Sequence, residues 1–375
     1  MTKPEIKGYC PGALRPMLSG DGIVVRVRPF GGALNPTQSG GIAKLAAEFG
    51  NGIIDLSSRG NIQLRGVSTH THASLLEGLH QIELLDENEA TESRRNVLAT
   101  PFWQESDQTT QLSAELSDAL GANDAPRTPS KFGYAVDTGV MPVLQTASAD
   151  VRIERDVAGS LVLAADGAAL AQPVTPETAI PAALALAEWF MANRSTQTRM
   201  AALLNAGAPL PAHFSVARQT QNYAPTPGPT SVGVLVGLAF GQLSIEALST
   251  LSKLGTLRMT PWRMLLVENV DVVPKALGLI TEPDDPMLRV MACTGAPGCT
   301  QGYAETRPLA RKLARDLKAG QVLHVSGCTK GCAHPRPATF TVTATENGFV
   351  LIKDGRAGDK PVLQDLTLDD IVKAI

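Results

Sequence analysis

Residues 293–299 read CTGAPGC and residues 328–332 read CTKGC, so four of the five cysteines in this 375-residue chain lie in two short runs. Five residues separate Cys293 from Cys299, and three separate Cys328 from Cys332. The segment between the runs is predicted to form a helix followed by a strand, which would bring the two pairs together. Paired thiols from distant segments are typical of a zinc site or an iron–sulfur cluster.

The loops that carry these cysteines are rich in small residues. Gly295 and Gly298 lie inside the first pair, and Gly327 and Gly331 lie next to the cysteines of the second. Small residues let backbone amides approach cluster sulfurs, whereas structural zinc usually pairs its ligands at spacings of two to four. A helix predicted over 303–320 would turn its positive end toward an anionic cluster. The pattern favours a [4Fe–4S] cluster, with zinc as the alternative. Cys10 stands apart and is interpreted as an ordinary thiol.

Composition excludes several classes of function. The 33 Lys and Arg against 36 Asp and Glu give a net charge of −3, which offers no general attraction to nucleic acid or an anionic membrane. The apolar stretches are too short to span a bilayer, and residues 1–16 lack the features of a signal peptide. We therefore expect a cytoplasmic protein, in which reduced thiols favour metal binding over disulfides.

The sequence pattern indicates a mixed α/β protein with an internal repeat. Strands are predicted at 22–28 and 52–66, with a helix at 39–50 between them that is capped by Ser39. After a proline-rich linker at 222–230, the order recurs as a strand at 233–239, a helix at 244–255 and two strands within 256–270. Two equivalent halves packed together, from a chain longer than one typical domain, are the expected result.

Cationic side chains mark only the first copy of this repeat. Residues alternate between the faces of a strand, so Arg26 and Arg28 share one face. A second shared face carries Arg59, Asn61, Gln63 and Arg65. The positions predicted to correspond in the second copy are Gly237, Ala239, Trp262, Met264, Leu266 and Glu268. Two interpretations stay open: a solvated sheet face, or a polyanion site kept in one copy and lost from the other.

The cysteine spacing resembles the cluster signature of the sirohaem-dependent sulfite and nitrite reductases. That resemblance implies an α/β (α+β) fold with two pseudo-symmetric ferredoxin-like halves and two larger α/β units, the second of which carries the [4Fe–4S] cluster. The cluster ligands would be Cys293, Cys299, Cys328 and Cys332. The implied division is a first half at 1–75, an α/β unit at 76–221, the linker at 222–230, a second half at 231–278 and the cluster unit at 279–375.

Further segments carry the resemblance to the tetrapyrrole site of that superfamily. SSRGNIQLRGV (57–67) is similar to the segment that grips the carboxylates of sirohaem. The tetrapyrrole-binding residues implied are Arg26, Arg59, Asn61, Gln63, Arg65 and Lys330. RVRPFGG (26–32), SRRNVLAT (93–100) and PSKFG (129–133) resemble segments with catalytic cations, which implies that role for Arg28, Arg95 and Lys131.

Two departures weaken the case for sulfite or nitrite as the substrate. Gly133 replaces the second lysine of the superfamily segment, and Lys330 replaces an asparagine often found between the last two cysteines. Reduction of a small anion requires dense positive charge above the iron. Taken together, CPGALRPM, SGDGIVVRVRP, SRGNIQLRG, MTPWR and SGCTKGCAHP resemble the precorrin-3B synthases of aerobic cobalamin biosynthesis.

That closer resemblance implies an O2-dependent monooxygenase. It would hydroxylate precorrin-3A at C20, and the ring A acetate would close a γ-lactone. An external electron donor is expected, a nicotinamide-linked reductase. A mononuclear non-haem iron is also implied, with His70, His72 and His334 as candidate ligands. The alternatives are an assimilatory sulfite or nitrite reductase that retains sirohaem, and a tetrapyrrole carrier without catalysis.

Overall fold

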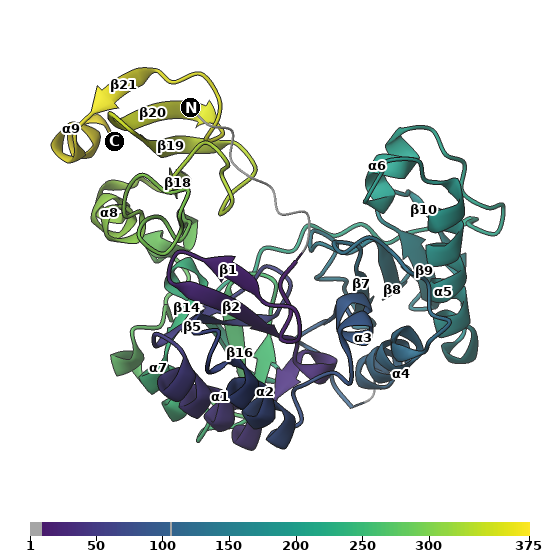
Figure 1. Cartoon of the computed structure of the whole chain (residues 1–375). Helices are drawn as coiled ribbons and strands as arrows, with labels where there is room; N and C mark the ends of the chain where they lie inside the picture. Colours follow the sequence, from purple (N-terminus) through teal and green to yellow (C-terminus); the bar gives the residue numbers. More distant parts are fainter. Residues whose placement is uncertain (1–9, 106) are drawn as a thin grey trace.

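The computed structural model describes residues 10–105 and 107–375 and contains four β-sheets (Figure 1). Residues 1–9, which the sequence analysis assigns to the first half, lie outside the described residues. Two of the five-stranded sheets belong to the repeated halves, the six-stranded sheet belongs to the middle unit, and the last sheet belongs to the C-terminal unit. The predicted mixed α/β architecture is confirmed.

The first half is a sheet covered by two helices. It comprises β1 (Met17–Ser19), β2 (Gly22–Val27), a short turn at Phe30–Gly32, β3 (Ala33–Leu34), α1 (Pro36–Phe49), β4 (Ile53–Leu56), β5 (Ile62–Val67) and α2 (His72–Gln81). Helix α1 begins earlier than predicted, because Asn35 rather than Ser39 caps it and forms a capping box with Gln38. Ile42, Ala43 and Ala46 recur at helical spacing and face the core.

The second half repeats this order and exchanges an edge strand with the first. It comprises β12 (Gly228–Thr230), β13 (Gly233–Gly237), a turn at Ala239–Gly241, β14 (Gln242–Ser244), α7 (Ile245–Leu251), β15 (Leu257–Met259) and β16 (Met264–Glu268). Strand β14 pairs with β4, and β3 pairs with β15, so each half completes the sheet of the other around one shared core. The predicted repeat is confirmed; β12 begins inside the stretch predicted to be linker.

The correspondence between the two copies differs by two residues from the sequence alignment. Arg26 pairs with Gln63, whereas Leu235 pairs with Leu266 at the matching place. Arg26 therefore corresponds to Leu235 rather than to Gly237, and Arg28 corresponds to Gly237. The pairing of β2 with β5 also shifts register by one residue between Ile23 and Val25, whereas β13 and β16 pair without a shift. A displacement of two residues along a strand keeps the same sheet face. The residues of the second copy that correspond to Arg26 and Arg28 are therefore still uncharged.

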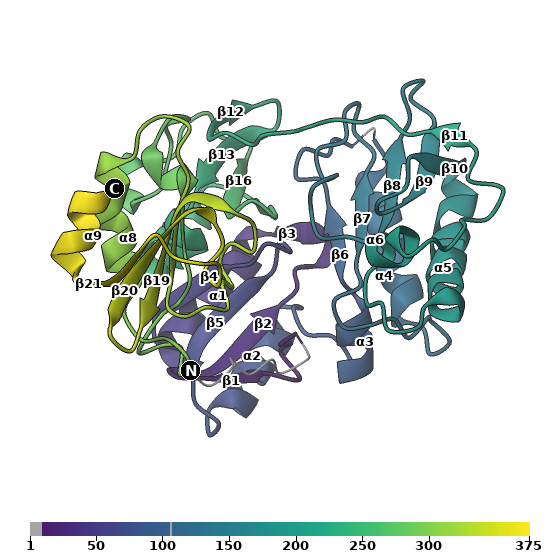
Figure 2. The ribbon, with the colours of Figure 1, turned by 90° about the horizontal axis from the view of Figure 1, so that it is seen from above.

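The middle unit lies to one side of the interlocked halves (Figure 2). Its elements are α3 (Glu89–Arg94), β6 (Val97–Ala99), α4 (Thr109–Gly121), β7 (Tyr134–Asp137), β8 (Val151–Arg155), β9 (Leu161–Ala165), β10 (Leu170–Pro173), α5 (Pro176–Asn193), α6 (Met200–Asn205) and β11 (Val216–Ala217). The sheet order is β11-β10-β9-β8-β7-β6, with an apolar core against α4 and α5. Strands β8 and β9 form a hairpin, and Gly159 has the positive φ that its turn requires.

The C-terminal unit places the two cysteine runs at neighbouring strand ends. Its elements are a turn at Pro286–Arg289, β17 (Val290–Ala292), α8 (Arg307–Leu313), β18 (Leu323–Ser326), β19 (Ala338–Thr345), β20 (Gly348–Gly355), β21 (Leu363–Leu366) and α9 (Leu368–Ala374). Strands β17 and β18 are parallel neighbours; Cys293 directly follows β17, and Cys328 follows β18 after Gly327. Their carboxyl ends meet at one sheet edge. The helix predicted over 303–320 is shorter, since α8 begins only at Arg307.

Helices of the described residues do not combine the length and apolarity that a membrane crossing requires.

Candidate functional site

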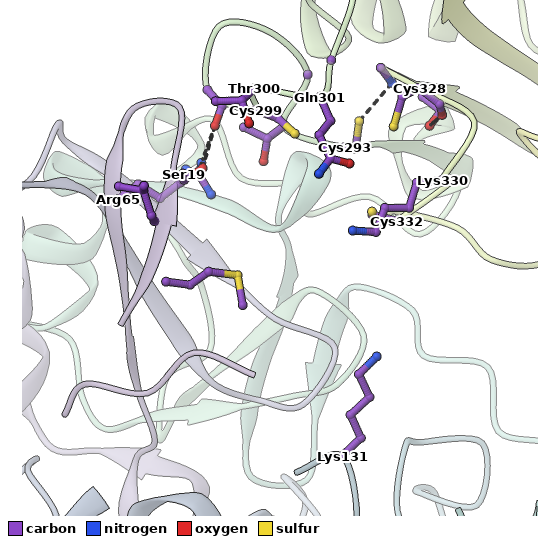
Figure 3. A pocket seen from close by; sticks show the side chains of 18 residues that line it. Ser19, Arg65, Lys131, Cys293, Cys299, Thr300, Gln301, Cys328, Lys330 and Cys332 are labelled. Carbon is purple, nitrogen blue, oxygen red and sulfur yellow. Dashed lines mark hydrogen bonds between the residues drawn. The ribbon is translucent and has the colours of Figure 1, made fainter. Parts of the chain in front are cut away.

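All four clustered cysteines line one cavity of about 330 Å³ (Figure 3). The first half contributes Met17, Ser19 and Arg65 to its wall, and the middle unit contributes Lys131. Lys330 lies beside Cys332, and the amine of Lys131 is directed toward the cysteines from the opposite side. Segments far apart in the sequence thus place thiols and cations around a single space, as the sequence analysis expected.

The cysteine loops fit an iron–sulfur cluster by their donors and their close packing. The Gly327 N–H donates a hydrogen bond to Cys293 Sγ at 3.1 Å. A side chain at Gly327 would stand 3.1 Å from the Gly295 Cα, so only glycine lets the loops approach this closely. Burial raises the pKa of the Cys328 and Cys332 thiols, and a bound metal would offset this by stabilising the thiolates.

The arrangement also separates a cluster from a single metal ion. Across residues 10–105 and 107–375, no three His, Cys, Asp or Glu side chains are placed to hold one ion. A four-iron cluster needs one thiolate on each iron, around a larger body, and four thiols around a common cavity match that need. Cys293, Cys299, Cys328 and Cys332 are therefore the residues that could hold such a cluster.

Arg65 lines the cysteine cavity and is held there by ion pairs with residues of the first half. Its guanidinium forms two hydrogen bonds with Asp21, at 2.9 and 2.8 Å, and lies 3.8 Å from Asp55. It also donates to the Gly298 carbonyl at 3.1 Å, inside the first cysteine loop. Asp55 in turn accepts a hydrogen bond from Arg307 at 3.3 Å. The sequence reasoning missed Asp21, Asp55 and Arg307, because no local pattern distinguishes them from surface charges.

Arg26 and Arg28 are buried side by side on β2 and just after it. Burial lowers the pKa of Arg26 to about 10, and Gln63 accepts two hydrogen bonds from this guanidinium when its amide is turned to match, at 3.2 and 2.7 Å. Burial also lowers the pKa of Arg28. Glu92 lies 3.4 Å from Arg28 Nη1, while Arg28 Nε and Nη1 form no hydrogen bond. Arg28 therefore retains donors that an anionic group could use.

Arg95 is held firmly inside the protein. It forms a two-fold pair with Asp86 at 2.7 Å for both contacts and donates to the Arg28 carbonyl at 3.0 Å. The Phe30 ring lies 3.8 Å from its guanidinium carbon. The catalytic role of Arg95 stays a prediction; in this structure its charge serves to fix the segment that carries Arg28.

Arg59 joins the first half to the middle unit. It donates to the Lys131 carbonyl at 2.7 Å and to Ser148 Oγ at 3.0 Å. Gly133 lies next to it, and a Cβ built there would stand 3.2 Å from Arg59 Nη1. The guanidinium thus occupies the space into which a side chain at 133 would extend. Asn61 is buried in the same β4–β5 turn, where its backbone carbonyl accepts from the Ser57 N–H.

The candidate iron ligands from the sequence are dispersed. His70 lies exposed in a turn and His72 begins α2, so the two do not lie on a strand. His72 Nε2 is 2.9 Å from the Ala13 carbonyl. The ring of His334 lies 5.8 Å from that of buried His324, whose two nitrogens form no hydrogen bond. Sequence reasoning found no signal at His324, because a lone histidine in a strand carries none. These histidines do not fit a mononuclear iron site.

Three comparisons relate the chain to known proteins. Residues 15–82 match the family model of the nitrite/sulfite reductase ferredoxin-like half domain. A precorrin-3B synthase from Sinorhizobium sp is 28% identical over an alignment that covers 95% of this chain and 84% of that protein. The nitrite reductase (NAD(P)H) large subunit of Klebsiella oxytoca is 34% identical over 23% of this chain and 9% of its own length.

A solved structure extends the likeness to the whole fold. The Mycobacterium tuberculosis NirA protein matches with a TM-score of 0.64 at 20% identity, over 94% of this chain and 79% of that one. The half-domain match, the near-full-length relative and the common architecture agree with one another. The chain is thus similar in sequence to a precorrin-3B synthase along nearly its whole length and, over residues 15–82, to the nitrite/sulfite reductase half domain, and it is similar in fold to the NirA protein.

Proposed function

We propose that this chain is a precorrin-3B synthase. The observation that carries the proposal is the similarity to a precorrin-3B synthase along 95% of the chain, whereas the nitrite reductases match over less than a quarter of it. Gly133 supports the same choice, because Arg59 fills the space that a second lysine would need. The cysteine cavity supports an enzyme that holds a [4Fe–4S] cluster.

The proposed reaction is an O2-dependent hydroxylation of precorrin-3A at C20, with the ring A acetate closing a γ-lactone. One oxygen atom enters the product and the other leaves as water, so the reaction takes two electrons from an external donor. A bound [4Fe–4S] cluster would supply one-electron transfer from that donor. Since the described residues present no three-ligand site for a mononuclear iron, no step of the proposal depends on one.

The residues of the chain would bind and orient the acidic substrate. Precorrin-3A carries acetate and propionate groups, which guanidinium and ammonium groups bind well. Lys131 and Lys330 both line the cysteine cavity and would hold carboxylates there. Arg28 has unused buried donors, and Arg26 is oriented by Gln63. A substrate carboxylate at Arg28 would relieve the cost of leaving those donors unpaired, about 1–3 kcal/mol.

A pigment test separates this proposal from the reductase alternative. The protein would be purified anaerobically, its absorption spectrum recorded, and its pigment extracted with acid and acetone. The proposal predicts broad iron–sulfide absorption and no extractable tetrapyrrole, followed by conversion of added precorrin-3A with O2 and a reductant. An iron-containing isobacteriochlorin in the extract, with no such conversion, would contradict it and identify a sirohaem reductase.

A further inference from the structure

One carbonyl group docks the first cysteine loop onto the first half of the molecule. The Gly298 oxygen accepts hydrogen bonds from Ser19 Oγ at 2.7 Å, from Arg65 Nη2 at 3.1 Å and from the Gly20 N–H at 3.3 Å. All three donors belong to β1, the turn after it, or β5. Gly298 immediately precedes Cys299, so this contact fixes the backbone from which a cysteine side chain enters the cavity.

The β1–β2 turn and the cysteine loop approach each other too closely for a side chain. A Cβ at Gly20 would stand 2.4 Å from the Pro297 carbonyl oxygen and 3.3 Å from the Thr300 N–H nitrogen. Both neighbours are backbone atoms, which cannot move aside as a flexible side chain can. The β1–β2 turn is therefore complementary in shape to residues 297–300, and the contact between the two loops requires glycine at position 20.

Arg65 is prevented from leaving this position by its own partners. Its side chain is 7% exposed and lies between Asp21 and Asp55. Arg65 Nη2, which donates to the Gly298 carbonyl, also donates to Ser19 Oγ at 3.0 Å. Arg65, Ser19 and Asp21 therefore form one hydrogen-bonded network beside Gly298. Paired donors in this rigid fork geometry are a property of arginine that lysine lacks. The tetrapyrrole contact predicted for Arg65 would require it to give up these bonds.

The network also reaches the other side of the cysteine loops. Asp55 links Arg65 to Arg307, the first residue of α8. Thr306, just before it, donates to the Cys293 carbonyl at 2.6 Å. Burial raises the pKa of Asp55, while Arg307 and Arg65 oppose that rise. The Cys293 carbonyl is therefore held by Thr306, whose neighbour Arg307 pairs with Asp55 of the first half, and the Gly298 carbonyl before Cys299 is held by Arg65.

We propose that Arg65, with Ser19 and Gly20, is a positioning residue for the cluster site: it holds the Cys293–Cys299 loop against the tetrapyrrole cavity. The inference rests on the cluster of the proposed function and adds a role for Arg65 to it. Residues that orient metal ligands usually change metal affinity by tenfold to a hundredfold when replaced. A positive charge near a cluster also favours its reduced, more negative state, so its removal should lower the reduction potential.

The test measures cluster retention and potential rather than activity. Wild type, Arg65→Gln and Arg65→Lys would be purified anaerobically, and their iron and sulfide contents and the rate of bleaching by an iron chelator would be measured. The midpoint potential would be followed by electron paramagnetic resonance. Arg258→Gln is the matched control, because Arg258 is an equally buried, ion-paired arginine in the second half that makes no contact with the loop.

Arg65→Gln should bleach about ten times faster than wild type or more and show a lower potential, with Arg65→Lys between the two. Arg258→Gln should lose stability yet bleach at the wild-type rate. Gly20→Ala provides a second route if Arg65→Gln does not fold, and it should bleach faster with Arg65 intact. Equal bleaching and equal potentials in all variants would overturn the inference, as would a wild-type protein without iron. A cluster-loaded wild type that fails to convert precorrin-3A would refute the proposed function alone.

Discussion

Restoring a lysine at position 133 should dislodge Arg59 from the middle unit. A Cβ at Gly133 would stand 3.2 Å from Arg59 Nη1, 3.3 Å from the Asn96 carbonyl oxygen and 3.4 Å from the Ser148 carbonyl oxygen. The first two distances are tighter than ordinary contact and the third is at its lower limit, and two of the three neighbours are backbone atoms. The guanidinium is the only one of the three that can move, and movement would break its bonds to Lys131 and Ser148.

The expected cost follows from the bonds lost and the crowding added. A hydrogen bond from a charged donor contributes about 1.5–3 kcal/mol, and overpacking costs about 1–3 kcal/mol. Because Arg59 is only partly buried, the lower values apply, and the loss of both hydrogen bonds together with the crowding should reduce the free energy of unfolding of Gly133→Lys by about 4 kcal/mol. Gly139→Lys is the matched control, since the nearest atom to its Cβ is 3.8 Å away. It should cost less than about 1 kcal/mol.

The assay is urea unfolding of wild type, Gly133→Lys, Arg59→Gln and the double variant, with the transition of the middle unit followed separately. If Arg59 is the group that must move, the lysine should cost about 3 kcal/mol less when Arg59 is already absent, because the two hydrogen bonds are then already lost. Strictly additive effects, or a Gly133→Lys variant as stable as Gly139→Lys, would refute the reasoning.

Other predictions follow from single contacts. Cys328→Ser should lose cluster iron and sulfide in elemental analysis; full retention would remove Cys328 from the ligand set. Glu92→Gln should destabilise the protein by about 3 kcal/mol in urea, because it leaves the charge of buried Arg28 without its partner, and Arg28→Met should recover part of that loss. Burial raises the pKa of Asp137 to about 6 from its usual 3.8. The folded protein therefore binds this proton more tightly than the unfolded chain, so stability should fall as the pH rises from about 4 to about 6. Asp137→Asn should remove that slope from unfolding curves; an unchanged slope would assign it to another group.

Local patterns in the sequence were sufficient for the architecture. Strand alternation and helical spacing identify the two halves, because each buries one face against a shared core. The cysteine runs could be placed together because their spacing and small neighbours restrict the chemistry. What the sequence did not reveal is the exchange of β3 and β14, which depends on pairing between distant segments. The register shift between β2 and β5 was equally hidden, and the sequence alignment of β2 with β13 was displaced by two residues.

The sequence predicted which residues lie at the candidate site better than it predicted their contacts. The cavity brings together the four cysteines, Arg65, Lys131 and Lys330, as the sequence analysis expected. The presence of an arginine in the sequence does not show whether its guanidinium is already paired within the protein. Arg95 is paired with Asp86, Arg65 is paired with Asp21, and Arg59 donates a hydrogen bond to Ser148. Asp21 and Ser148 are remote in the sequence from their arginines, and Asp86 precedes Arg95 by nine residues, so no spacing rule reveals these partners.

The central claim is that the tetrapyrrole is a substrate that turns over in this protein. The most direct measurement is mass spectrometry of the tetrapyrrole after anaerobically purified, iron-loaded protein is given precorrin-3A, a chemical reductant and isotope-labelled dioxygen. The account predicts a product that has gained one labelled oxygen atom, with two electrons consumed for each molecule formed. Precorrin-3A recovered unchanged, while the same preparation reduces sulfite or nitrite with a bound iron isobacteriochlorin, would contradict it.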